Sequence, residues 1–196
     1  MTGFPFGVII LGAGAGTRFG GPKAMALVEP GIRFIDRVVS VARDAGADPI
    51  VAVLPKGVAP PAPARAVVGN SASEQISSLR LGLMQFANTV TEAVLVWPVD
   101  HPYVVVESIR AVLDSYTRTR ATIVIPTHNG RRGHPGLFAR ACWREIMTVE
   151  QNGARGVIQA YGSRVVEVPV SDAGVVRNID RTTDMNAFQE GDDVVS

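Results

Sequence analysis

Glycines and two cations share one short stretch near the N-terminus, and these residue types together suit the binding of phosphate. The stretch runs from Gly12 to Lys23, is rich in glycine at both ends, and includes Arg18 as well as Lys23. Glycine lets backbone N–H groups come close to phosphate oxygens. Arginine offers a bidentate contact and lysine a point charge. A triphosphate that loses pyrophosphate needs positive charge close to its leaving oxygens. The stretch therefore favours a triphosphate site over a tight turn with two solvated cations.

Two common phosphate motifs do not fit this stretch. The dinucleotide fingerprint Gly-x-Gly-x-x-Gly requires a third glycine where Thr17 or Phe19 stands, depending on the starting glycine. The P-loop requires Gly-Lys followed by Ser or Thr, whereas Pro22 precedes Lys23 and Ala24 follows it. A glycine loop of another type, with its own cations, remains.

A carboxylate farther along the chain suits the metal that a triphosphate site requires. Asp100 comes just after the apolar run Ala93–Trp97. Mg²⁺ prefers carboxylate oxygens together with phosphate oxygens, so an aspartate at a strand end that faces the glycine loop would complete the site. The alternative is that Asp100 only caps a turn or the next helix.

Apolar runs predict the elements that position these residues. We expect strands at Phe6–Leu11, Ile50–Leu54, Ala66–Val68, Ala93–Trp97, Thr122–Ile125 and Val165–Val170. Helical spacing predicts helices around residues 35–42, 76–83 and 106–116, a segment over 137–149 that begins extended and becomes helical, and a short helix from Asp184. The four prolines of Pro55–Pro63 mark a loop.

Apolar strands that alternate with amphipathic helices imply an α/β fold with a mainly parallel sheet covered on both faces, a three-layer Rossmann-like arrangement. Ligands of such sheets bind beyond the carboxyl ends of the strands. This rule selects the loop after Leu11, the turn at Asp100 and the segment Asn178–Asp180. We expect these three segments to meet at one edge.

Composition limits the class of protein. The 196 residues suit one domain over 1–196, and a net charge of +1 gives no general attraction to nucleic acid or to anionic membranes. The apolar run Val8–Leu11 is too short to cross a bilayer and has no basic segment before it, so we expect no signal peptide. Cys142 is the single cysteine, which excludes a disulfide framework and suits a buried small hydrophobe. A cytoplasmic enzyme is the expectation.

The glycine stretch resembles the signature of the MobA/MocA-like nucleotidyltransferases, Leu-Ala-x-Gly-x-x-x-Arg-Met-Gly-x-x-Lys. Gly12 stands for the usual Ala and Phe19 for the usual Met, and neither change removes a charge. Ser78–Leu83 resembles the Ser-x-x-x-Gly-Leu helix start of the family, and Asp100–Pro102 resembles its Asp-x-Pro turn.

Two further motifs follow in the same order. Gly133–Pro135 resembles the Gly-His-Pro of molybdopterin cytidylyltransferases. Asn178–Asp184 is similar to the Asn/Asp-Ile-Asp-Thr-Pro-Glu-Asp segment of the family but lacks its proline. Five ordered motifs are much more specific than any one of them.

The resemblance implies a role for each matching residue. Arg18, Lys23 and Asp100 would be catalytic, Asp100 and Asp180 would hold Mg²⁺, and His134 would contact the acceptor. The nucleotide would lie on Leu11, Gly12, Ala13, Gly14, Gly16, Arg18, Lys23, Asn70 and Ser78. Alternatives stay open: His134 as a structural hydrogen-bonding residue, Asn178 or Asp180 as turn-fixing residues, and Arg131–Arg132 as either an anion grip or a solvated loop tip.

The implied activity is Mg²⁺-dependent nucleotidyl transfer with release of pyrophosphate. CTP is favoured because the cytidylyl members carry Ala at position 13, and molybdopterin is favoured as acceptor because of Gly133–Pro135. A molybdoenzyme that receives the cofactor is a further implied partner. The near alternative is a guanylyl- or sugar-phosphate nucleotidyltransferase, and the distant one is a non-catalytic protein that binds and delivers the molybdenum cofactor.

Overall fold

A computed structural model describes residues 3–14, 16, 20–70, 74–150 and 153–180 of the chain. The strands are β1 Phe6–Leu11, β2 Leu27–Glu29, β3 Ile32–Arg33, β4 Ile50–Leu54, β5 Arg65–Val68, β6 Ala93–Pro98, β7 Ile123–His128, β8 Arg131–Arg132, β9 Gly136–Ala139 and β10 Val165–Pro169. The helices are α1 Phe34–Asp44, α2 Gln75–Met84, α3 Val106–Thr119, α4 Trp143–Thr148 and α5 Gly153–Tyr161. The expected strands and the three expected main helices are confirmed, whereas the expected helix from Asp184 lies outside the described residues.

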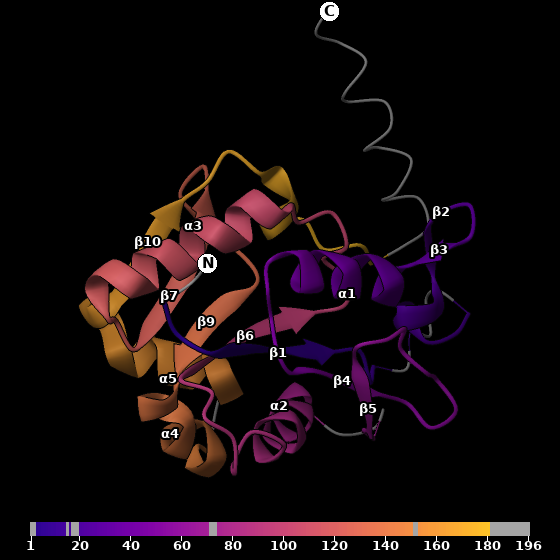
Figure 1. Ribbon diagram of the computed structural model, residues 1–196, viewed down its shortest axis with the longest axis horizontal. Helices are drawn as coiled ribbons and strands as arrows, with labels where there is room; N and C mark the ends of the chain where they lie inside the picture. The colour runs from indigo at the N-terminus through magenta and orange to yellow at the C-terminus, as the bar shows by residue number, and fades with distance from the viewer. Residues whose placement is uncertain (1–2, 15, 17–19, 71–73, 151–152, 181–196) are drawn as a thin grey trace, which may run out of the picture.

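The main sheet has the order β10-β7-β9-β6-β1-β4-β5 (Figure 1). Its β10–β7, β6–β1, β1–β4 and β4–β5 pairs are parallel, while β9 runs antiparallel between β6 and β7. The short strand β8 pairs with β7, and β2 and β3 form a separate hairpin. The expectation of a mainly parallel α/β sheet is therefore confirmed, with β9 and the short strand β8 as the antiparallel exceptions.

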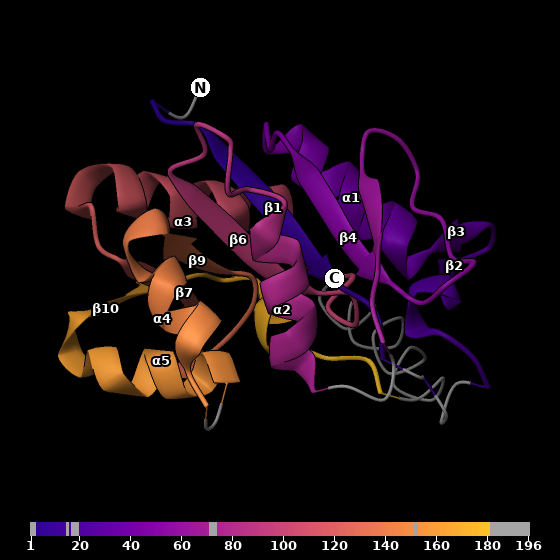
Figure 2. The same cartoon turned by 90° about the horizontal axis from the view of Figure 1, so that it is seen from below.

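Helices cover both faces of the sheet, as the apolar strands require. Every residue of β1, β4 and β6 is buried, because these strands lie in the middle layer. The helices α1 and α3 lie on one face, and α2, α4 and α5 lie on the other (Figures 1 and 2). Each face has its own apolar cluster. This packing fixes the strand ends at which the predicted site residues stand.

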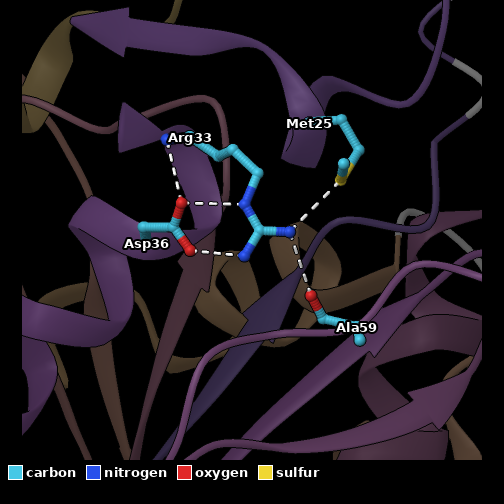
Figure 3. Close-up of polar contacts among 4 residues, drawn as sticks. All are labelled: Met25, Arg33, Asp36 and Ala59. Atoms are coloured by element: carbon cyan, nitrogen blue, oxygen red, sulfur yellow. Dashed lines mark hydrogen bonds and ion pairs between the residues drawn. The ribbon is translucent and has the colours of Figure 1, made fainter. Parts of the chain in front are cut away.

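Arg33 ties the start of α1 to the loops beside it (Figure 3). Its Nε and Nη2 donate to the Asp36 carboxylate at 2.8 and 2.6 Å, and its backbone N–H donates to the same group at 2.9 Å. Its Nη1 donates to Met25 Sδ at 3.5 Å and to the Ala59 carbonyl at 3.2 Å. The segment after Lys23 is therefore held against the helix and the proline-rich loop.

Candidate active site at the carboxyl edge of the sheet

Lys23 bridges the two carboxylates that the sequence places at this edge. Its Nζ donates to Asp100 Oδ2 at 3.0 Å and to Asp180 Oδ1 at 2.5 Å. Asn178 Nδ2 donates to the other Asp180 oxygen at 2.6 Å. The three segments selected by the strand-end rule therefore meet, as expected.

Backbone hydrogen bonds hold these segments together without the help of the charges. The Val99 N–H donates to the Leu11 carbonyl at 3.0 Å, which places the turn after β6 beside the loop after β1. The Ile179 N–H donates to the Asp100 carbonyl at 2.8 Å, which brings the late segment to the same point. Because Asp180 follows Ile179 directly, its carboxylate reaches the Lys23 ammonium.

The charges of the cluster favour its ionised form. Burial alone would lower the pKa of Lys23, but its hydrogen bonds to Asp180 and Asp100 and their negative charges outweigh burial, so the pKa is raised. Side-chain exposure is 20% for Lys23, 23% for Asp100 and 44% for Asp180. Water can therefore reach Asp180 most easily. The cluster lies near the surface, at the carboxyl edge of the sheet, rather than inside the core.

Two carboxylates that already share one cation suit a divalent metal. Both oxygens lie within 3.0 Å of the same Lys23 atom, so they converge on one point. Within the described ranges, no group of three or more His, Cys, Asp or Glu residues gathers as a metal site would. Asp100 and Asp180 could hold a divalent metal that takes its other ligands from phosphate and water.

A cavity of about 210 Å³ opens beside this cluster. Of the residues predicted to bind nucleotide, every one except Arg18 lines it: Leu11, Gly12, Ala13, Gly14, Gly16, Lys23, Asn70 and Ser78. Asp100 lines it too, together with Gln75, Pro98 and Val99. Arg18 lies outside the described residues. Sequence reasoning missed Gln75, whose place as the first residue of α2 gave no chemical signal.

Gly16, which lines this cavity, and Gly69, which lies against its wall residue Ala13, have no room for a side chain. A Cβ at Gly16 would stand 1.9 Å from the Gly21 carbonyl oxygen, and its φ of +57° also favours glycine. A Cβ at Gly69 would stand 2.7 Å from the Ala13 methyl group. Gly16 thus lies directly against Gly21, and Ala13 packs against the backbone of Gly69, which precedes Asn70.

A larger cavity of about 780 Å³ adjoins the first one. Leu11, Gln75 and Pro98 line both cavities and so mark their junction. The predicted acceptor residue His134 lines the larger cavity, as does Arg132 of the arginine pair. Sequence reasoning missed the wall supplied by α5, which no motif marks.

His134 is held in a neutral state at the wall of the larger cavity. Its backbone N–H donates to the Val175 carbonyl at 2.7 Å, and its ring meets that of His101 at 4.8 Å between centroids. Burial, together with the nearby His101, lowers the pKa of His134 to about 4. Burial likewise lowers the pKa of His101, although Asp100 opposes it. The ring of His134 therefore offers hydrogen bonds without a charge near neutral pH.

Cys142 shows no sign of nucleophilic chemistry. Cys142 is buried, as expected, and burial raises the pKa of its thiol to about 12, so it is no nucleophile. Across the part of the chain that the structure describes, no helix is both long enough and apolar enough to cross a bilayer.

Comparisons with known proteins identify the family and the fold of the chain. The pattern of the MobA-like NTP transferase domain matches residues 8–165. Among solved structures, the Rv0371c protein of Mycobacterium tuberculosis H37Rv is similar, with a TM-score of 0.81 and 22% identity over 96% of this chain and 99% of that one. The same protein in complex with manganese has a TM-score of 0.75, with 21% identity over 96% and 99% of the two chains.

A third similar structure is 2-C-methyl-D-erythritol 4-phosphate cytidylyltransferase from Thermus thermophilus. Its TM-score is 0.72, with 21% identity over 95% of this chain and 98% of that one. The TM-scores show that these proteins share the fold of this chain, and at identities this low they show the fold alone. None of the curated proteins compared with the chain matches it.

Proposed function

We propose that this chain, which belongs to the MobA-like NTP transferase domain family, moves a nucleotidyl group from a nucleoside triphosphate onto a phosphorylated small molecule. The supporting observation is the pair of cavities that meet at Leu11, Gln75 and Pro98 beside the Lys23 cluster. The smaller cavity takes the triphosphate and the larger one the acceptor. At their junction the two substrates would meet.

The reaction is an in-line displacement at the α-phosphorus. A phosphate oxygen of the acceptor forms a bond to that phosphorus, and the bond to the bridging oxygen breaks as pyrophosphate leaves. A phosphate monoester is ionised near neutral pH, so the protein needs no nucleophile of its own and no strong base. Positioning and charge carry the catalysis. Lys23 neutralises the triphosphate, and the sequence assigns Arg18 to the same task.

Asp100, which lines the smaller cavity, and Asp180 would hold Mg²⁺ beside that cavity. When bound, the metal neutralises charge on the phosphate oxygens. The manganese complex of the Rv0371c protein is compatible with a divalent metal in this fold. The Lys23 ammonium contacts both carboxylates, so a metal held by Asp100 and Asp180 would share these two groups with it.

Molybdopterin is the acceptor that we propose, with a molybdoenzyme as recipient of the finished cofactor. The support is the Gly133-His134-Pro135 motif together with the position of His134 in the wall of the larger cavity. A Cβ at Gly133 would stand 2.4 Å from the Val175 carbonyl oxygen, so the glycine lets this loop lie close to its neighbour. The similarity to the erythritol-phosphate cytidylyltransferase keeps a sugar-phosphate acceptor as the alternative.

CTP is the triphosphate that we propose. The Ala13 methyl group narrows the smaller cavity, and Gly69 lets that methyl group settle without a clash. One methyl group in a pocket discriminates by about 1–3 kcal/mol, so a preference over GTP is expected rather than strict selectivity. Calorimetric titration of the wild type with CTP and GTP tests this choice. Tighter binding of GTP would overturn it and leave nucleotidyl transfer standing.

Release of pyrophosphate tests the activity itself. The full chain is incubated with molybdopterin and each of the four NTPs, with Mg²⁺ and with a chelator. We expect release that requires both Mg²⁺ and the acceptor and that is fastest with CTP. Tight binding of molybdopterin without release from any triphosphate would instead favour a protein that binds and delivers the cofactor.

A further inference from the structure

A strap, residues 172–180, leads from the end of β10 to the Lys23 cluster. Its last residue, Asp180, accepts a hydrogen bond from Lys23 Nζ at 2.5 Å. Apart from a short 3₁₀ helix, η5 Ala173–Val176, the strap has no regular structure of its own. Its course is therefore set by contacts with other parts of the molecule, and these contacts determine where the Asp180 carboxylate lies.

Asp172 fixes the start of the strap to the start of α3. One carboxylate oxygen, Oδ2, accepts hydrogen bonds from the Val105 N–H at 3.0 Å and from the Ser108 hydroxyl at 2.8 Å, across 67 and 64 positions of the chain. The other oxygen accepts from the Gly174 N–H at 2.7 Å, inside the strap itself. The dipole of a helix also favours a negative charge at its first turn. The carboxylate thus joins the strap to α3 with both of its oxygens in use.

The middle of the strap lies against two turns that each carry a histidine. His101 Nδ1 lies 3.4 Å from the Gly174 carbonyl oxygen, and the His134 N–H donates to the Val175 carbonyl at 2.7 Å. A Cβ at Gly174 would stand 2.5 Å from the Tyr103 carbonyl oxygen, so glycine is required for this approach. The strap is therefore packed closely against the turn that follows β6.

The end of the strap is held by a buried residue rather than by the exposed charges. The Ile179 side chain is fully buried, and its N–H donates to the Asp100 carbonyl at 2.8 Å. The Asp180 side chain is 44% exposed, and an ion pair that water can reach contributes little to the stability of a chain segment. The contacts that precede Asp180 in the strap therefore determine its position more than its pairing with Lys23 does.

We infer that Asp172 is a positioning residue: by fixing the strap to α3, it holds Asp180 in contact with Lys23 beside the smaller cavity. The inference rests on the proposed function for the role of Asp180 as a metal ligand, whereas the attachment of the strap stands without it. Without the Asp172 carboxylate, the start of the strap can leave α3, and the hydrogen bond of Ile179 to Asp100 opens more often. A metal that needs both carboxylates is then held less tightly.

Hydrogen exchange of single amides in the full chain, followed by NMR, tests the attachment without metal or substrate. We expect Asp172→Ala to speed exchange of the Ile179 and His134 amides about tenfold, because both amides take part in holding the strap. The Val99 amide, which bonds to the Leu11 carbonyl outside the strap, is the internal reference and should respond much less. Equal acceleration of all three amides, or none at Ile179, would overturn the inference.

Two further variants separate the attachment from a general loss of stability. Ser108→Ala removes one of the three hydrogen bonds to the Asp172 carboxylate, so it should speed Ile179 exchange about two- to threefold. Ile146→Val shortens a fully buried side chain of α4 that lines neither cavity, so it should lower the thermal unfolding midpoint and leave Ile179 exchange at the wild-type ratio to Val99. An Ile179 amide that responds as strongly to Ile146→Val as to Asp172→Ala would contradict a specific role for Asp172.

Mn²⁺ binding to the full chain, measured by the electron paramagnetic resonance of the free ion, tests the consequence for the metal. We expect Asp100→Asn to abolish binding, Asp172→Ala to weaken it about tenfold and Ile146→Val to leave it unchanged. In the pyrophosphate assay, excess Mg²⁺ should restore turnover to Asp172→Ala, which keeps both carboxylates, but not to Asp100→Asn. Wild-type Mn²⁺ affinity in Asp172→Ala would overturn the positioning role. A wild-type chain that binds no Mn²⁺ would instead contradict the proposed metal site, while Ile179 exchange would still decide whether Asp172 holds the strap.

Discussion

At the scale of single residues, Lys23 joins two distant parts of the chain. One ammonium group neutralises two carboxylates from segments that are 77 and 157 positions away in the chain. The same group lines the cavity proposed for the triphosphate. Lys23 therefore links the proposed metal ligands to the cavity proposed for the nucleotide.

Replacing Lys23 should damage catalysis far more than folding. We expect Lys23→Ala to lower turnover about a hundredfold or more, because a charged contact in such a site contributes about 2–4 kcal/mol. The chain has one other lysine, Lys56, which is exposed in the proline-rich loop, so Lys56→Ala is a matched control that should keep wild-type rates. Steady-state pyrophosphate release compares the variants. Near-normal turnover of Lys23→Ala would contradict the triphosphate role.

His134 should make the stability of the fold depend on pH. Its folded-state pKa of about 4 lies below the ordinary value of 6.5. As the pH falls through this window, the unfolded chain takes up a proton on the ring and the folded chain does not, so stability is lost there and is unaffected above it. We expect His134→Gln to remove on the order of 1–2 kcal/mol of this loss, a value reduced because the residue as a whole keeps some contact with solvent.

Urea unfolding of the wild type and of His134→Gln across this pH range measures the effect. The difference between the two free energies of unfolding should change between about 6.5 and 4 and be constant above that range. Parallel curves over the whole range would show that the His134 ring is as easily protonated in the fold as in the unfolded chain.

At the scale of elements, the start of α1 offers the clearest test. Arg33 and Asp36 cap the helix and join it to Met25 and Ala59. We expect Asp36→Ala to lower the free energy of unfolding by about 1 kcal/mol near neutral pH. The hydrogen bond from Arg33 lowers the pKa of Asp36 below 3.8, so this contribution should be lost as the pH falls through that lowered value.

The matched control for this cap is Asp44→Ala at the other end of α1, where the carboxylate is exposed and paired with its neighbour Arg43. Exposed pairs contribute about 0–1 kcal/mol, so little change is expected. Chemical denaturation of both variants gives the comparison. A loss in Asp44→Ala as large as that in Asp36→Ala would mean that the cap has no special role.

Some elements follow from the sequence and others do not. The apolar runs of β1, β4 and β6 predict buried strands because every residue in them faces a covered layer. The direction of β9 is not encoded in its four buried residues, so its antiparallel place between β6 and β7 could not be read from periodicity. The helix α5 has glycine at positions 153 and 156, a poor helix signal that packing against α2 overrides.

The same division applies to the site. Strand ends can be read from the sequence, so the meeting of Lys23, Asp100 and Asp180 could be predicted. Gln75 and Arg155 stand at helix starts with no motif, and only the tertiary packing of α2 and α5 brings them to the cavities. No local sequence pattern predicts tertiary contacts of this kind.

At the scale of the whole molecule, the two cavities proposed for the substrates meet at one edge of the sheet. Residues from the first strand, the middle strand and the first turn of α2 line both cavities. The preference for one nucleotide base depends on two segments that are distant in the sequence, since Ala13 of the first loop packs against Gly69 after the edge strand β5. We expect Ala13→Gly to move the preference from CTP toward GTP, by about 1–3 kcal/mol at most. Competition between the two nucleotides in one calorimetric titration measures the shift.

The fate of the α-phosphate tests the central claim most directly. The full chain is given Mg²⁺, molybdopterin and CTP labelled at the α-phosphorus. Nucleotidyl transfer predicts that the label joins the acceptor in equal amount to the pyrophosphate released. It also predicts that Asp100→Asn abolishes the transfer, while Asp114→Asn, at an exposed position on α3, keeps it. Label that stays in CTP, is found only in free CMP, or reaches the acceptor equally well with Asp100→Asn would contradict the account.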